Sequence, residues 1–116
     1  MSEAELIELA KQDSFYFGEL YNTYFDRIFR FVFKRLGGNE EVAGYLTQQT
    51  FMKAMANIGK YEDRGLPFCS WLYRIAQNEV SMFFRNAKKD YTVDIDEGKF
   101  KDMCDEANIG KYMSAE

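Results

Sequence analysis

Histidine is absent from these 116 residues, and proline and tryptophan each occur once. Without histidine, the chain lacks the side chain that most often serves as a general base or a metal ligand. Neither usual spacing of a glycine-rich phosphate loop occurs, and no pair of acidic residues lies in an apolar setting. We therefore expect a protein that is not an enzyme and that carries no metal site and no cofactor.

The chain also lacks a long apolar run. No segment approaches the roughly 20 apolar residues that a membrane span requires, and the first residues are acidic, unlike the basic start of a signal peptide. The two cysteines, Cys69 and Cys104, have no metal-binding spacing. These features predict a cytoplasmic protein without membrane insertion, whose cysteines are free thiols in a reducing compartment.

Acidic residues exceed basic ones, with a formal net charge of −4, but the excess is local. Residues 1–90 hold 12 basic and 12 acidic residues, whereas residues 91–116 hold 3 lysines and 7 acids. Within 74–89, four basic residues face one acid. A basic patch on a neutral domain is sufficient for a weak contact with nucleic acid, although basic residues are also common at the solvated C-terminal ends of helices.

What is present is helical periodicity. Apolar residues recur at helical spacing within 3–11, 15–36, 40–57 and from 67 to about 87. Gly37 and Gly38 end the second segment, Asn39 is placed to cap the third, and Pro67 suits the first turn of the fourth. We predict an all-α fold, a compact bundle of three main helices plus a short N-terminal helix, over residues 1–90, with 91–116 an acidic tail or the start of an interdomain linker.

The fourth segment is the most informative. Residues 67–78 read Pro-Phe-Cys-Ser-Trp-Leu-Tyr-Arg-Ile-Ala-Gln-Asn and follow a turn-like stretch with a glycine at 65. Arg74 and Asn78 are four residues apart, so they share a face of the predicted helix. A cation, an amide and several aromatic rings beside a loop suit nucleic acid better than catalysis on a small molecule.

The order of these features resembles region 2 of bacterial extracytoplasmic-function (ECF) RNA polymerase sigma factors. The resemblance covers roughly residues 5–90 and rests on the 67–78 motif together with Leu-Thr-Gln-Gln-Thr-Phe at 46–51. It implies a transcription initiation domain that binds the β′ clamp helices of core RNA polymerase. It also implies recognition and melting of the minus-ten promoter element, through capture of non-template-strand bases in the loop before the last helix.

Site residues follow from the resemblance position by position. Residues 60–66 correspond to the base-capturing loop, and Asn78 matches an asparagine near its pocket. The resemblance places Arg74 as a phosphate contact. Arg85, Lys88 and Lys89, which come later in the sequence, would contact the DNA backbone further along. The predicted DNA-binding set is Tyr61, Arg64, Arg74, Asn78, Arg85, Lys88 and Lys89.

The predicted polymerase-binding set lies on the third segment and consists of Tyr45, Gln48, Gln49 and Met52. The family usually carries acids where this chain has Gly44, Tyr45 and Gln49, and those acids meet a basic polymerase surface. Full factors of the family continue into a helix-turn-helix domain that reads the minus-35 element, and some are held by an anti-sigma factor. We therefore expect this sequence to be region 2 of a longer factor, with an anti-sigma factor as a further partner.

Several of these residues have a structural alternative. Trp71 suits the core better than a DNA contact, Arg74 could pair with an acid of a neighbouring helix, and Asn78 could be a satisfied polar group inside the bundle. Tyr45 and Met52 could form an apolar patch for a protein partner. The corresponding alternative function is a sigma-like helical protein-interaction module that no longer directs initiation.

Overall fold

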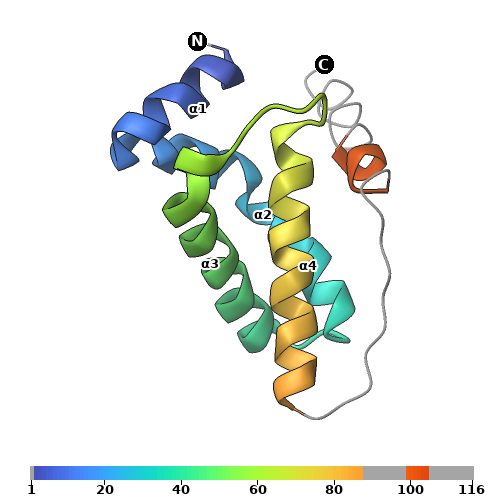
Figure 1. Ribbon diagram of the computed structural model, residues 1–116. Coiled ribbons are helices and arrows are strands. Elements are labelled where there is room, and N and C mark those ends of the chain that lie inside the picture. The colour runs from blue at the N-terminus through green and yellow to red at the C-terminus, as the bar shows by residue number, and fades with distance from the viewer. Residues whose placement is uncertain (1, 88–98, 105–116) are drawn as a thin grey trace, which may run out of the picture.

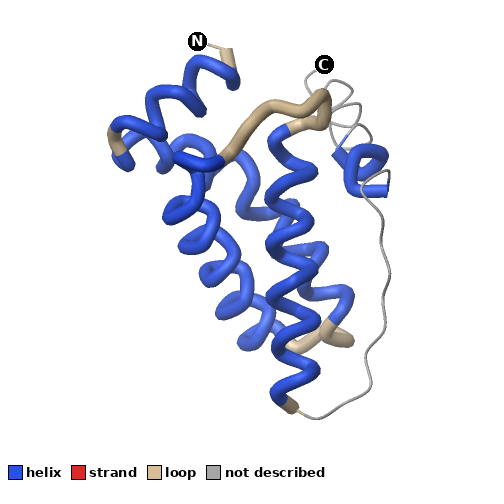
Figure 2. The backbone as a smooth tube through the Cα atoms, in the orientation of Figure 1, coloured by secondary structure: helices blue, strands red, loops and turns tan. Residues whose placement is uncertain are grey.

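The computed structural model describes residues 2–87 and 99–104, and the regular secondary structure in these ranges is all helical, joined by loops (Figures 1 and 2). The main helices are α1 (Glu3–Gln12), α2 (Phe17–Arg35), α3 (Glu40–Asn57) and α4 (Phe68–Asn86). Two short 3-10 helices, Ser14–Tyr16 and Ile58–Lys60, precede α2 and follow α3. No helix within the described ranges is long and apolar enough to span a membrane.

Local sequence explains where the helices begin. The side chain of Ser2 accepts a hydrogen bond from the Glu5 amide, which caps α1 at 3.2 Å. Asn39 caps α3 in the same way, accepting from the Val42 amide at 3.1 Å. At the turn between α2 and α3, Gly37 and Gly38 adopt positive φ values of 67° and 91°, a conformation that glycine alone adopts freely.

Helices α2, α3 and α4 pack against one another around one core, and α1 lies across one end of them (Figure 1). Aliphatic side chains at the centre are almost fully buried, including Leu20, Ile28, Val32, Leu72 and Val80. Burying such side chains supplies the main free energy that holds the bundle together. The predicted fold class, three main helices plus a short N-terminal one, is confirmed.

Polar contacts join the helices where the apolar core ends. The ammonium of Lys53 on α3 contacts a carboxylate oxygen of Glu79 on α4 at 2.6 Å, and Glu79 is buried. On the other side of α4, the guanidinium of Arg35 donates to the side-chain oxygen of Gln77 at 3.1 Å. These contacts orient α4 relative to both of its partners.

The cysteine prediction was wrong. Cys69 and Cys104 form a disulfide with a Cα–Cα distance of 6.0 Å, so neither is a free thiol. Their separation of 35 residues conceals the contact in the sequence, because helical residues 99–104 return to the bundle and bury Phe100 and Cys104. The predicted domain boundary at residue 90 lies outside the described residues and stays a prediction.

Candidate nucleic-acid interface

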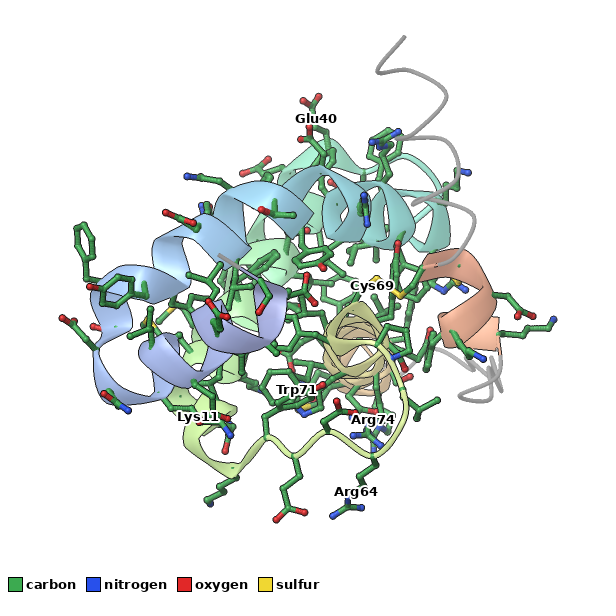
Figure 3. All side chains as sticks on the ribbon, turned by 90° about the horizontal axis from the view of Figure 1, so that it is seen from above. Lys11, Glu40, Arg64, Cys69, Trp71 and Arg74 are labelled. Carbon is green, nitrogen blue, oxygen red and sulfur yellow. A yellow bond between two sulfur atoms is a disulfide. The ribbon has the colours of Figure 1, made fainter. Side chains whose placement is uncertain are left out.

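A hollow of about 300 Å³ lies between the loop after α3 and the first turns of α4. We call it the loop hollow; its lining residues are Lys60, Tyr61, Glu62, Arg64, Leu66, Pro67, Ser70, Trp71 and Arg74. Three of the predicted DNA-binding residues, Tyr61, Arg64 and Arg74, are therefore brought together. In a view along α4, Trp71 and Arg74 lie on the side of the helix that faces the loop carrying Arg64 (Figure 3).

Two aromatic rings line the loop hollow, and a third ring packs behind them. The ring centroid of Tyr61 lies 5.1 Å from that of Trp71 and 5.2 Å from that of Phe68, and the last two are 5.4 Å apart. Phe68 is buried, whereas Tyr61 and Trp71 are half-buried and line the hollow. Trp71 thus combines the predicted packing role with an accessible aromatic surface, the kind on which a nucleic-acid base stacks.

The loop has a defined shape at its tip. Gly65 has a φ of 84°, and its amide donates to a carboxylate oxygen of Asp63 at 2.9 Å. A side chain that accepts from the backbone two residues later stabilises a turn, and glycine permits the left-handed conformation there. Arg64 between them is exposed and contacts the carboxylate of Glu62 at 3.5 Å. The turn therefore holds a cation at the rim of the hollow.

Helix α1 supports the loop from the opposite side. The ammonium of Lys11 lies 6.0 Å from the Tyr61 ring centroid, and a second, smaller hollow separates α1 from the loop. The hydroxyl of Tyr24 on α2 donates to a carboxylate oxygen of Glu3, which fastens the start of α1. Burial, aided by the charges of Asp63 and Glu3, raises the pKa of Tyr61 above its ordinary value.

A neighbouring hollow of about 330 Å³ extends from the loop hollow along α4 towards α3. We call it the side hollow; it is lined by Lys53, Asn57, Lys60, Trp71, Ile75 and Asn78, and it shares Lys60 and Trp71 with the loop hollow. The side chain of Asn78 is exposed here, so Asn78 is not the buried polar group of the structural alternative.

Sequence reasoning did not select Lys53 and Asn57. They are four residues apart on α3, and Lys60 follows three residues later. This helical spacing was a usable signal, because residues four apart lie on one face of a helix.

Of the remaining predicted DNA-binding residues that the structure describes, Arg85 does not line the loop hollow. Arg85 is exposed in the last turn of α4, eleven residues beyond Arg74, which corresponds to roughly 16 Å along a helix axis. Lys88 and Lys89 lie outside the described residues. Arg74 is exposed but has a partner of its own, so its predicted phosphate contact and its structural alternative both remain.

The predicted polymerase-binding residues occupy the outer face of α3. Tyr45 and Met52 each expose 59% of their surface, Gln48 is exposed, and Gln49 is half-buried. Met55, one turn beyond Met52, is also 42% exposed and was not predicted. Residues at this spacing form one stripe along the helix, with two sulfur-containing side chains at one end.

Comparison with known proteins identifies the family. The sigma-70 region 2 family matches residues 20–90, which is more than half of the chain and includes the loop hollow, the side hollow and the α3 stripe. The chain belongs to the sigma-70 region 2 family. The matched range covers most of α2 and all of α3 and α4, whereas α1 lies before it.

Curated relatives are ECF RNA polymerase sigma factors. The chain is 36% identical over 85 residues to BldN of Streptomyces coelicolor, a match that covers 72% of this chain and 32% of the relative. SigW and SigM of Bacillus subtilis are 32% and 30% identical, over 81% and 67% of this chain and 49% and 46% of their own lengths. The chain thus spans between a third and a half of these relatives, and no solved structure matches it.

These matches confirm the resemblance to ECF sigma factors. Because the family and all three relatives are sigma factors, which are not enzymes, the assignment to a non-enzymatic transcription factor family is also confirmed.

Proposed function

We propose that this chain is the promoter-recognition and polymerase-binding domain of an ECF sigma factor. In this proposal, the domain works in the cytoplasm on core RNA polymerase, with promoter DNA as its second partner and an anti-sigma factor as a possible regulator. It recognises the minus-ten element by taking a base of the displaced non-template strand into the loop hollow.

The observation that carries this proposal is the composition of the loop hollow. Aromatic faces from Tyr61 and Trp71 and cations from Lys60, Arg64 and Arg74 converge on a space of about 300 Å³. Stacking of a base on an aromatic side chain contributes roughly 1–3 kcal/mol, and cations beside it interact with the flanking phosphates. A base enters such a space only after it leaves the duplex stack, which links recognition to melting.

The side hollow extends this proposed path. Asn78 supplies an amide that can read a base edge, and Lys53 and Lys60 add positive charge to the lining of the same hollow. Since Trp71 lines both hollows, one indole ring separates the captured base from its neighbour on the strand. Arg85, Lys88 and Lys89 continue the path in the proposal.

Binding of the isolated chain to single-stranded DNA of minus-ten sequence tests this half of the proposal. A fluorescently labelled strand should bind weakly, and the logarithm of the binding constant should fall linearly with the logarithm of the salt concentration, because lysines and arginines displace counterions from phosphates. Trp71→Leu keeps much of the apolar contact with Phe68 and should lose the stacking. Unchanged affinity in this variant would contradict base capture at the loop hollow.

The polymerase half of the proposal uses the α3 stripe. Core RNA polymerase is incubated with an ECF sigma factor that carries a fluorophore, and this chain is added as a competitor. Displacement of the labelled factor supports binding at the clamp. Gln49→Glu and Gly44→Glu restore acidic residues on α3, so each should strengthen the competition if the surface meets basic polymerase residues.

A second candidate function is favoured by the apolar character of the same stripe. Tyr45, Met52 and Met55 are exposed, and the acids usual at 44, 45 and 49 are missing. Such a surface suits a protein partner other than polymerase, in a sigma-like interaction module that does not direct initiation. Absence of competition by the native chain and by both acidic variants would favour this module.

A further inference from the structure

The Cys69–Cys104 disulfide lies away from the proposed DNA surface. Cys69 belongs to the first turn of α4, and its side chain is on the face opposite the loop, directed towards residues 99–104 (Figure 3). Cys69 and Cys104 expose only 3% and 1% of their surfaces. The bond therefore joins the start of α4 to a helical segment that comes 35 residues later.

Besides Cys104, two side chains of residues 99–104 supply apolar contacts with the bundle, Phe100 and Met103. Phe100 is buried, with its ring centroid 6.3 Å from that of Phe31 on α2 and 6.2 Å from that of Tyr73 on α4. Met103 is half-buried, and the other three residues of the segment are exposed. A segment attached by so few apolar contacts opens at a low free-energy cost once its covalent attachment is broken.

We propose that Cys69 and Cys104 form a reversible thiol–disulfide modification site. Oxidation fastens residues 99–104 to α2 and α4, and reduction releases them. The inference rests on the proposed function only for the compartment: a protein that acts on RNA polymerase works in the cytoplasm, where thiols are kept reduced. Disulfides that form there are usually transient and redox-sensing rather than permanent.

A peroxide oxidises the two cysteines, and a dithiol reduces the disulfide. One cysteine thiolate attacks a peroxide, whose O–O bond breaks to give a sulfenic acid and an alcohol or water; the second thiol displaces water from the sulfenic acid and forms the S–S bond. For reduction, a dithiol of the thioredoxin class attacks one sulfur, and its second thiol resolves the mixed disulfide. The reductant leaves as a disulfide, and both cysteines regain protons.

Burial of both sulfurs places a condition on this exchange. A reductant reaches neither sulfur while residues 99–104 are packed, so Phe100 and Met103 must leave their packing while the S–S bond is still closed, before attack can occur. The segment is the natural element to open, because Cys69 is held within α4.

Cys69 also connects the pair to the loop hollow. Its neighbour Phe68 packs against Tyr61 and Trp71, and its other neighbour, Ser70, lines the hollow. Cys69 therefore belongs to the same turn of α4 as a residue that lines the loop hollow.

Thiol trapping on the purified 116-residue chain tests the proposal. The native protein is treated with hydrogen peroxide or with reduced thioredoxin, alkylated with iodoacetamide in denaturant and weighed by mass spectrometry. We expect no alkylated cysteine after peroxide, two after thioredoxin, and complete return after a second peroxide treatment. Thiols that remain alkylatable after peroxide would overturn the proposal, as would a disulfide that thioredoxin cannot reduce in the native chain.

Proteolysis tests whether the bond fastens the segment. Trypsin should cleave after the exposed Lys101 roughly tenfold faster or more in the reduced chain, because cleavage follows the population of the opened segment. Cleavage after Lys34 on α2 is the internal control and should not change. Cys104→Ser and Cys104→Ala should both show the fast rate whatever the redox treatment. Equal rates for the oxidised and reduced chains would overturn the fastening role, and neither readout depends on DNA or polymerase.

Discussion

Asn78 is the residue at which a structural and a DNA-reading role separate most clearly. Its side chain is exposed at the side hollow, so Asn78→Ala removes no buried contact and should shift the free energy of unfolding by less than about 0.5 kcal/mol. Loss of one hydrogen bond to a base should weaken single-stranded DNA binding by roughly 1 kcal/mol, about fivefold. Fluorescence anisotropy and thermal unfolding measure the two effects, and a large fall in the thermal midpoint would show a structural role instead.

Lys53 and Glu79 form the most buried charged contact described between two helices. Lys53→Met leaves the Glu79 carboxylate buried without its ammonium partner, and we expect a loss of about 1–3 kcal/mol in the free energy of unfolding. Chemical denaturation measures this loss. Adding Glu79→Gln in the Lys53→Met background removes the isolated charge and should recover part of the stability. A Lys53→Met variant as stable as the native chain would show that the contact contributes nothing.

The sequence predicted which residues lie at the site better than it predicted the burial and the partners of individual side chains. Tyr61, Arg64 and Arg74 were selected by motif position and meet at one hollow. Glu79 was read only as the single acid in a basic stretch, because its burial depends on Lys53, which lies 26 residues earlier. Long-range pairings of this kind depend on how helices pack, and a pattern within one helix cannot specify them.

Gly44 departs from the family pattern, and we expect it to lower the stability of α3. It lies inside α3, where glycine costs roughly 0.5–1 kcal/mol relative to alanine, and a Cβ built there would have no atom within 4 Å. Gly44→Ala should therefore raise the free energy of unfolding by about that amount, measured by chemical denaturation. Gly37→Ala is the matched control: at a φ of 67° a side chain is strained, and we expect a loss of about 1 kcal/mol. Destabilisation by Gly44→Ala would contradict the open space at this position.

The helices themselves were predictable to within a few residues. Predicted segments at 3–11, 40–57 and 67 to about 87 correspond to α1, α3 and α4, because capping residues and apolar periodicity are local signals. The predicted start of the second segment was less accurate: Ser14–Tyr16 form a 3-10 turn, and α2 begins at Phe17. Support of the loop by α1 was not predicted, since it depends on the contacts of Glu3 and Lys11 with distant tyrosines.

The ionisation of three tyrosines makes the free energy of unfolding of the whole molecule depend on pH in the alkaline range. Burial raises the pKa of Tyr24, Tyr61 and Tyr73 above the ordinary value of 10.0, and the hydrogen bond to Glu3 raises that of Tyr24 further. Each folded-state pKa exceeds the unfolded one, so the stabilisation is fully present below pH 10 and is lost as the pH rises through the folded-state values.

We therefore expect the free energy of unfolding to fall with pH above about 10, because the unfolded chain releases phenolic protons first. Urea denaturation at pH 8, 10 and 11 measures the fall. Tyr24→Phe should be less stable at pH 8, since it lacks the hydrogen bond to Glu3, and should lose less between pH 10 and 11 than the native chain. An equal alkaline loss in this variant would show that Tyr24 does not contribute.

The covalent link between Cys69 and Cys104 also determines how the molecule bears mechanical force. A pull on the C-terminal side reaches Cys104 and passes directly through sulfur to the start of α4, so the chain between the two cysteines carries no tension. An unfolding motor that starts from that end would therefore extract α1, α2 and α3 before it could straighten α4. Optical-trap extension should show the difference, because reduction should lengthen the fully unfolded chain by about 120 Å, the contour of the loop released. Equal extended lengths in both redox states would show that no such loop is closed.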